Sequence, residues 1–262
     1  MIRSLYIAAS GMNAQKQNMD VISNNMANIS TYGFKQGRAE FQDLMYQAIQ
    51  TPGGPTRDGL NTPTGQQVGL GVSTASVGKN FSQGSFVNTG NQLDIAIEGE
   101  GFFQILQPDG TMAYSRNGAF QLDNNGRLVN AEGLPLQPEM TMPADTTSIT
   151  IGTDGIVSVQ ENNQTNLTQI GQIELARFPN PAGLRAMGNN LFMETDASGN
   201  AVLSNPQQNG FGATAQGFLE TSNVNIVQEM VNMIVSQRAY ESNSKAVQTS
   251  DEMLQTANNL KR

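Results

Sequence analysis

Two carboxylates in the middle of the chain come closest to a catalytic arrangement. Glu98 and Glu100 stand two positions apart in the stretch IAIEGEGFF, so they would share one face of a strand. A pair of carboxyl groups can supply the acid and the base or nucleophile of glycoside hydrolysis. Any two of the 22 acidic residues could also meet in the fold, and the sequence indicates no preferred pair. A carboxylate-dependent enzyme that cleaves peptidoglycan therefore stays open as an alternative.

Two further stretches match binding motifs only in part. Residues 99–101, GEG, suggest a nucleotide-binding loop, but the third glycine is missing and no helical pattern follows, which favours a hairpin turn. Residues 123–126, DNNG, begin like a calcium loop, but Glu132 comes too early to be its bidentate ligand, which favours a β-turn. The sequence predicts no cofactor and no metal site.

Composition narrows the function classes further. The 262 residues include no histidine and no cysteine, which removes the usual general base near neutral pH and any thiolate nucleophile or metal ligand. The net charge is -8 and the 14 basic residues are scattered singly, so nucleic-acid binding is not expected. No apolar run reaches the ~20 residues of a membrane span. Polar residues from Asn13 onward interrupt the first apolar patch, so we expect no cleaved signal peptide.

Heptad spacing at both ends predicts two long helices that would position the rest of the chain. The apolar positions that we expect to form subunit interfaces are Leu5, Met12, Met19, Ile22, Met26 and Ile29 in the first helix, and Met233, Tyr240, Val247 and Leu254 in the second. A further row in the second helix, Ser236, Asn243, Ser250 and Ala257, is small or polar and permits close helix approach. The two helices could pack on each other within one monomer, but their methionine-rich, interrupted apolar rows favour packing against neighbouring subunits.

The stretch SNNMANISTYGFK, residues 23–35, predicts how the chain leaves the first helix. If Gly33 follows the helix end, its access to positive φ closes the helix and lets Phe34 pack back on Ile29. Asn28 is one of three asparagines here that readily bond backbone groups. These residues, Asn28, Gly33 and Phe34, would set the direction of the chain after the helix.

Between the helices, short apolar or alternating runs are separated by turn signals, as in GFFQILQPDGTMAYSRNGAFQLDNNGRLVN. The expected fold is α+β, with terminal helices and an all-β, hairpin-rich middle. The predicted divisions are an N-terminal helix (1–34), an extended linker (35–79), a β-rich middle domain (80–221) and a C-terminal helix (222–262).

Several stretches resemble motifs of one protein family. ISNNMANISTYGFK and SNVNIVQEMVNMIVSQRAYESNSKAVQTSDEML resemble the terminal motifs of the bacterial flagellar rod and hook proteins, and NQLDIAIEGEGFFQI and YSRNGAFQLDNNGRLV resemble central ones. The resemblance covers essentially the whole chain. Residues 46–71 resemble an insertion typical of rod members, which favours the rod over the hook.

The resemblance implies a structural, non-enzymatic subunit that polymerises into a helical tube in the flagellar basal body. The terminal helices would form an inner coiled-coil layer, and the middle domain an outer layer. It also implies export by the flagellar type III apparatus, with proximal rod proteins, the hook protein and rod-surrounding ring proteins as partners. Another axial protein, the enzyme considered above and a monomeric adhesin-like binding module remain the alternatives.

Overall fold

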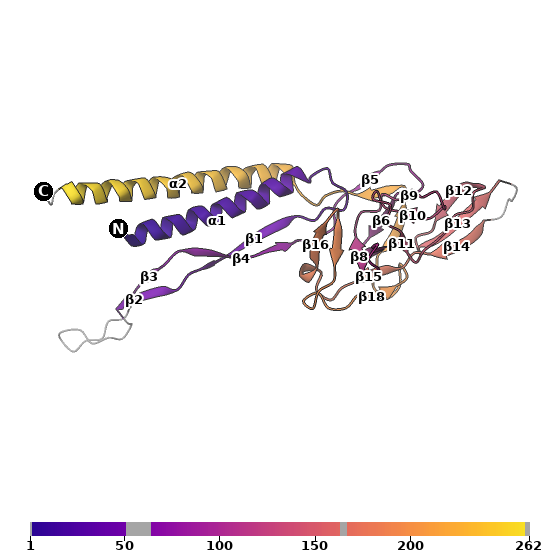
Figure 1. Cartoon of the computed structure of the whole chain (residues 1–262), viewed down its shortest axis with the longest axis horizontal. Coiled ribbons are helices and arrows are strands. Elements are labelled where there is room, and N and C mark those ends of the chain that lie inside the picture. The colour runs from indigo at the N-terminus through magenta and orange to yellow at the C-terminus, as the bar shows by residue number, and fades with distance from the viewer. Residues whose placement is uncertain (1, 51–63, 163–166, 260–262) are drawn as a thin grey trace. The chain divides into compact units, whose positions relative to one another are not determined.

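The computed structural model describes residues 2–50, 64–162 and 167–259, which form two units (Figure 1). The helical unit comprises Met1–Ala27, Gly37–Lys79 and Asn225–Arg262, and the β unit comprises Asn28–Gln36 and Asn80–Val224. The chain therefore has a helix near each end of its sequence and a strand-rich middle, which confirms the predicted α+β class.

Two helices and a two-part β-ribbon build the helical unit. α1 (Ile2–Ala27) packs on α2 (Ile226–Asn259) and on the ribbon strands β1 (Gly37–Asp43) and β4 (Val72–Lys79). The ribbon continues as the antiparallel pair β2 (Tyr46–Gln50) and β3 (Gln66–Gly69). In Figure 1, α1 runs between α2 and the ribbon. Ribbon strands thus stand where the sequence indicated an extended linker, of which residues 51–63 lie outside the described residues.

Asparagine side chains shape the ends of both helices. α2 begins at Ile226, inside the predicted range 222–262, because the Asn225 side chain caps the helix by accepting hydrogen bonds from the backbone N–H groups of residues 227 (3.0 Å) and 228 (3.2 Å). α1 ends at Ala27, earlier than expected. Just before that end, the Asn25 side chain makes two 2.8 Å hydrogen bonds with the backbone of Gly37, one in each direction. This asparagine fastens the last turn of α1 to the first residue of the ribbon.

The β unit is built almost entirely of short antiparallel strands. In chain order these are β5 (Phe86–Asn88), β6 (Ile95–Glu98), β7 (Phe102–Leu106), β8 (Met112–Ser115), β9 (Gln121–Leu122), β10 (Leu128–Val129), β11 (Leu136–Gln137), β12 (Thr146–Ile151), β13 (Ile156–Glu161), β14 (Thr168–Gln172), β15 (Leu175–Arg177), β16 (Arg185–Gly188), β17 (Leu191–Met193), β18 (Val202–Ser204), β19 (Ala213–Gln216) and β20 (Phe218–Glu220). The largest sheet has the order β16-β17-β8-β7-β15-β18, with β11 added at β7. β12, β13 and β14 form a separate three-stranded sheet.

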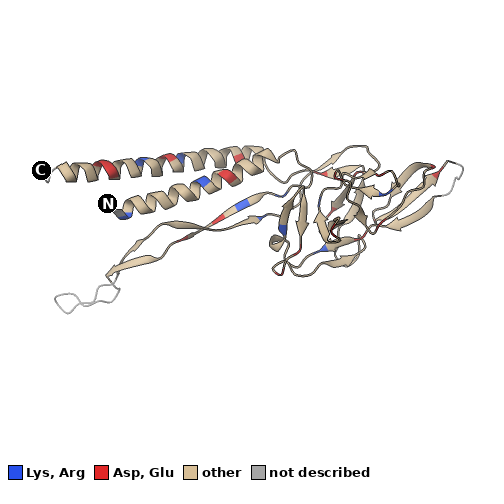
Figure 2. Cartoon of the chain, in the orientation of Figure 1, with Lys and Arg blue, Asp and Glu red and all other residues tan. Residues whose placement is uncertain are grey.

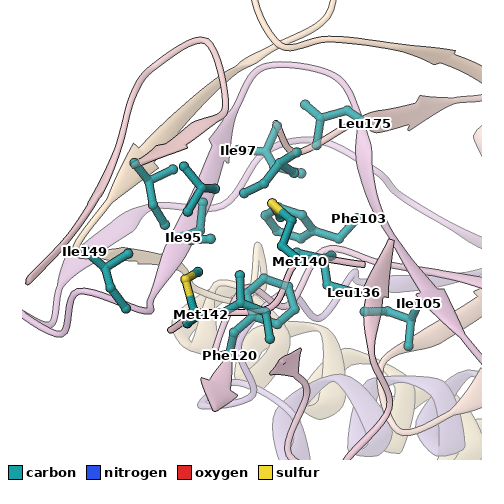
Figure 3. Packing of buried hydrophobic residues seen from close by; sticks show 14 of the residues in the cluster. Ile95, Ile97, Phe103, Ile105, Phe120, Leu136, Met140, Met142, Ile149 and Leu175 are labelled. Atoms are coloured by element: carbon teal, nitrogen blue, oxygen red, sulfur yellow. The ribbon is translucent and has the colours of Figure 1, made fainter. Parts of the chain in front are cut away.

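Alternating apolar residues from these strands meet in one main core. Ile95 and Ile97 of β6 and Phe103 and Ile105 of β7 point into it and are buried, as Figure 3 shows. The rings of Phe103 and Phe120 meet edge to face with centroids 5.1 Å apart, a favourable geometry for aromatic pairs. The β unit therefore encloses its own apolar core, as a stable domain requires.

Candidate assembly surfaces

A row of small and polar side chains lies in the contact between α1 and α2. The pairs, which we call the polar ladder, are Ser4 with Ser250, Gly11 with Asn243, Asn18 with Ser236, and Asn25 with Glu229. Each step of seven residues forward along α1 is matched by a step of seven residues back along α2, so the helices run antiparallel. The small or polar row of α2 is thus the row that faces α1 within one monomer.

The rungs of the ladder are in direct contact. The Asn18 amide donates a 2.8 Å hydrogen bond to the Ser236 hydroxyl, and the hydroxyl oxygens of Ser4 and Ser250 lie 3.3 Å apart. At the remaining inner rung, a Cβ atom added at Gly11 would stand 2.9 Å from the Asn243 amide nitrogen, closer than van der Waals contact. The ladder therefore lets the two helix backbones approach closely but gives the pair little apolar area.

The predicted interface residues lie beside this ladder. Ile22 is buried, whereas Leu5, Met12, Met19, Met26, Ile29, Met233, Val247 and Leu254 are half-buried and Tyr240 is 39% exposed. Met233, Tyr240, Val247 and Leu254 each follow a ladder residue of α2 by four positions, which puts them on the same side of the helix. Ile29 lies beyond the end of α1 and belongs to the β unit.

The larger exposed apolar surface of α2 faces the other way. We call it the apolar stripe, and its residues are Ile226, Val227, Met230, Val231, Ile234 and Val235, exposed by 48% to 67%. Val231 stands two residues after Glu229, and Ile234 two residues before Ser236, and two residues turn an α-helix by about 200°. The stripe therefore points away from α1. This was missed in the sequence, because heptad spacing marks several apolar rows without saying which one the partner helix covers.

Charge is sparse around the stripe. Between Asn225 and Gln237 the only charged residue is Glu229, which is buried at the ladder. Elsewhere, Figure 2 shows the Lys and Arg positions of the described residues spread along both units. The first part of α2 therefore presents an uncharged apolar face to its surroundings.

The ribbon carries a second set of exposed apolar side chains. Met45 is 82% exposed, and Tyr46 and Ile49 of β2 are 56% and 57% exposed. A two-stranded ribbon without a covering layer is only marginally stable in water. Interactions with α1, such as the hydrogen bond from Arg3 to Gln47 (2.5 Å), support one side of it. The exposed side is a further candidate surface for subunit contact.

The segment after α1 folds with the β unit. Gly33, predicted to close the helix, lies six residues beyond its end and has φ of 69°. A Cβ atom at Gly33 would stand 2.6 Å from the backbone nitrogen of Asn117. The backbone N–H of Gly33 donates a 2.8 Å hydrogen bond to the Glu220 carbonyl. Asn28 accepts a backbone hydrogen bond from Thr31 (3.2 Å), and Phe34 is half-buried. Gly33 thus permits a close backbone approach within the β unit and does not cap α1.

Lys35, two residues after Gly33, belongs to a buried cluster of three charged side chains with Arg116 and Glu220. The Lys35 ammonium lies 2.7 Å from one carboxylate oxygen of Glu220, and Arg116 Nε lies 2.8 Å from the other. Lys35 also donates to the Ser82 carbonyl, and the Gly84 N–H donates to Glu220. Burial lowers the pKa of Lys35, the contact with Glu220 opposes this shift, and the nearby Arg116 adds to it. This charge triad ties three segments far apart in the sequence into one point of the fold.

The triad also explains the glycines of residues 99–101. The guanidinium of Arg116 donates hydrogen bonds to the carbonyls of Gly99 (2.6 Å) and Gly101. These residues connect β6, which pairs with β19, to β7 in the largest sheet, so the predicted hairpin turn was wrong. The glycines have φ of 111° and 143°, which lets the chain bend around the arginine. The interactions were missed because Arg116, Lys35 and Glu220 come from distant motifs.

The residues considered for catalysis or binding have structural surroundings. Glu100 is exposed and lies 3.7 Å from Arg177, which lines a cleft of about 410 Å³ beside the triad. The cationic groups of that cleft already have carboxylate or carbonyl partners. At DNNG, the Gly126 N–H donates to the Asp123 carbonyl (2.8 Å), which confirms the predicted β-turn. Arg127 pairs with the Asp123 side chain, and its hydrogen bond lowers the pKa of that carboxyl.

No cluster of three or more potential metal-ligating side chains occurs within the described ranges. Of the helices that the structure describes, none is long and apolar enough to cross a membrane.

Known families match both ends and the middle of the chain. The family described as "Flagella basal body rod protein" matches residues 5–35, "Flagellar hook protein FlgE/F/G D1 domain" matches residues 96–159, and "Flagellar basal body rod FlgEFG protein C-terminal" matches residues 215–260. Together with the two-unit fold, these matches define a flagellar axial protein of the rod and hook class.

Full-length relatives identify the branch of that class. The chain is 50% identical to the flagellar basal-body rod protein FlgG of Buchnera aphidicola subsp. Schizaphis graminum over 99% of this chain and 100% of that one. It is 42% identical to FlgG of Bacillus subtilis over 100% of both chains, but 27% identical to the flagellar hook protein FlgE of Salmonella typhimurium over 97% of this chain and 99% of that one. The chain belongs to the FlgG family of flagellar basal-body rod proteins.

The family settles the function class. The chain is a structural subunit of the distal rod in the flagellar basal body and is not an enzyme, as the resemblance of its motifs implied. Membership implies assembly with other axial proteins of the flagellum.

Proposed function

We propose that the chain polymerises with copies of itself into a straight, rigid helical tube that transmits torque through the distal rod to the hook. The terminal helices form its inner layer and the β unit its outer layer. The observation that carries this proposal is the apolar stripe of α2, which points away from α1 and carries no exposed charge. Monomeric soluble proteins rarely leave a contiguous apolar surface of this kind uncovered.

The predicted interface residues fit the same mechanism. The half-buried rows that run through Met12 and Met19 on α1, and through Met233 and Val247 on α2, keep part of their apolar surface accessible beside the ladder. Neighbouring subunits would complete that burial. Each contact joins one surface to a different one on the next copy, so growth continues as an open helix.

The ribbon has a separate role in this proposal. Its exposed side chains at Met45, Tyr46 and Ile49 would be covered by adjacent subunits. Such contacts would cross-link neighbours and keep the rod straight and stiff. The part of the predicted insertion at residues 51–63 lies outside the described residues.

The remaining partners follow from position in the axial structure. Proximal rod proteins would contact the tube at one end and the hook protein at the other, with rod-surrounding ring proteins outside it. The chain would reach this site by the flagellar type III export apparatus.

A substitution within the apolar stripe tests polymerisation. Val231→Asp places a charge in the stripe. A strain that lacks this chain and produces the Val231→Asp variant in its place should form no distal rods. Val231→Leu keeps the position apolar and is the matched control. Basal bodies viewed by electron microscopy, together with swimming motility, give the readout.

Two outcomes would contradict the proposal. Complete rods in the strain that lacks this chain would exclude the function itself. Normal rods built from a stably folded Val231→Asp variant would exclude the stripe as the surface through which the subunits assemble.

A further inference from the structure

We propose that the polar ladder is the element that sets the register between α1 and α2. Alternative registers are conceivable for these two helices, because heptad rows can pair at several offsets that differ by seven residues. A single correct offset decides which part of α2 lies beside which part of α1. The register itself is a property of the free chain, whereas its consequence for assembly rests on the proposed function.

The first argument is the size of the paired side chains. At the two inner rungs an amide faces a residue that leaves it room, since Asn243 faces Gly11 and Asn18 faces Ser236. The separation at Gly11 is so close that even one added carbon would crowd Asn243. Each inner rung therefore pairs one amide with a small residue.

The second argument is what a slip would do. Moving α2 by one heptad, about 10.5 Å along the axis, would bring Ser4 opposite Ala257 and Gly11 opposite Ser250. The same movement would set Asn18 against Asn243, so that two amides would meet where each now faces a small residue. A slip in the other direction would set Asn18 against Glu229. Both offsets lose the Asn18–Ser236 hydrogen bond. The first brings Asn25 opposite Ser236 but separates it from Glu229, and the second leaves Asn25 opposite Ser222, which precedes α2.

The third argument is burial. Ser236, Ser250, Asn25 and Glu229 are all buried, and buried polar groups must keep their partners or lose free energy. Polar residues at core positions of paired helices are known to select register at some loss of stability. The ladder has this character, since it provides hydrogen bonds and shape but little apolar area. The correct register also keeps the apolar stripe on the side of α2 that faces away from α1.

Disulfide trapping in the purified full-length chain tests the proposal, because the sequence contains no cysteine of its own. Ser4→Cys with Ser250→Cys reports the observed register, since the two hydroxyl oxygens lie 3.3 Å apart. Ser4→Cys with Ala257→Cys reports the slipped register. We expect the first pair to cross-link roughly tenfold faster under mild oxidation, which corresponds to about 1.4 kcal/mol.

Small substitutions within the ladder should then weaken this preference. Asn243→Ala removes the amide that Asn18 would meet after the slip, so the ratio of the two cross-linking rates should fall at least about threefold. Asn18→Ala removes the other amide and should act in the same direction. Thr249→Ala removes an exposed polar side chain outside the ladder and should leave the ratio unchanged. Circular dichroism checks that helix content is retained in each variant.

The outcomes are decisive in either direction. Equal cross-linking of both pairs while the two inner rungs are intact, or none, would overturn the proposal, as would a ratio that neither alanine substitution in the inner rungs changes. Either result would refute the register proposal without bearing on the proposed function in rod assembly. Conversely, a strain that builds complete rods without this chain would refute the proposed function and not the register.

Discussion

The β unit and the helical unit place their polar groups in opposite ways. In the β unit, apolar strand residues fill the interior, and the buried charges of Lys35, Arg116 and Glu220 pair with one another, while backbone carbonyls accept further hydrogen bonds from the two cations. In the helical unit, polar side chains occupy the contact between α1 and α2, while the apolar stripe stays outside. The first arrangement stabilises an isolated domain. The second leaves apolar area available for neighbouring molecules.

Among the substitutions predicted here, removal of the carboxylate of the charge triad should cause the largest loss of stability. Glu220→Gln leaves two cations buried without their carboxylate, and loss of one member of a buried pair costs about 3–5 kcal/mol. Chemical denaturation of the purified chain measures the loss. Glu139→Gln, which removes an exposed carboxylate 2.8 Å from Arg127, is the matched control and should cost less than about 1 kcal/mol. Similar costs for both variants would show that the triad adds nothing to stability.

Gly33 and Gly90 provide a finer comparison, because both have φ of 69°. At Gly90 an added Cβ meets nothing within 4 Å, so Gly90→Ala should show only the backbone cost of about 1–2 kcal/mol. Gly33→Ala adds the collision with the backbone of Asn117, which should lower the free energy of unfolding by a further ~1–3 kcal/mol. Thermal unfolding of the two variants checks the difference. Equal melting temperatures would mean that the close approach at Gly33 is easily relieved.

Substitutions in the helices should separate stability from assembly. Met19→Asp and Val247→Asp place charges at half-buried positions, so each should destabilise the helical unit by roughly 1–2 kcal/mol. The β unit should stay folded, because its core uses none of these residues. Limited proteolysis reports the folding of the β unit, and electron microscopy reports the rods. We expect a resistant β fragment and no assembly, and normal rods from both variants would refute these interface residues.

The smallest expected effect lies at the turn after β9. The Arg127 hydrogen bond lowers the pKa of Asp123 below its ordinary 3.8, so the ionised form stabilises the fold above that pH. This contribution disappears as the pH falls through the lowered folded-state pKa. Arg127→Gln should move the pKa of Asp123 back toward 3.8 in an NMR titration. No movement would show that the interaction is absent in solution.

Local patterns predicted the architecture of the chain well. Heptad spacing indicated both helices, and the turn signals at Pro108-Asp109-Gly110 and at residues 123–126 marked the connections after β7 and β9. These features depend on neighbours in the sequence, which is why a single sequence reveals them. The end of α1 was placed too late, since Asn25 bonds Gly37 and the chain after Ala27 is held by the β unit rather than by a glycine cap.

Long-range pairings were beyond such patterns. Nothing near Lys35 indicates that its partner is Glu220, because the two lie 185 residues apart. The small and polar row of α2 was visible, but its partners on α1 were not, since heptad spacing does not give the offset between two helices. Surfaces for subunit contact are harder still, because they depend on molecules outside the chain.

The regular spacing of the ladder also limits how sequences of this family can change in length. One residue inserted within α1 between two rungs would rotate the following rungs by about 100° and remove them from the contact with α2 at once. An insertion in the middle of the chain alters no rung. The alignment with the hook protein of Salmonella typhimurium extends over 416 positions. We expect the additional length of such relatives to lie between the helices, while both helices keep their length and phase.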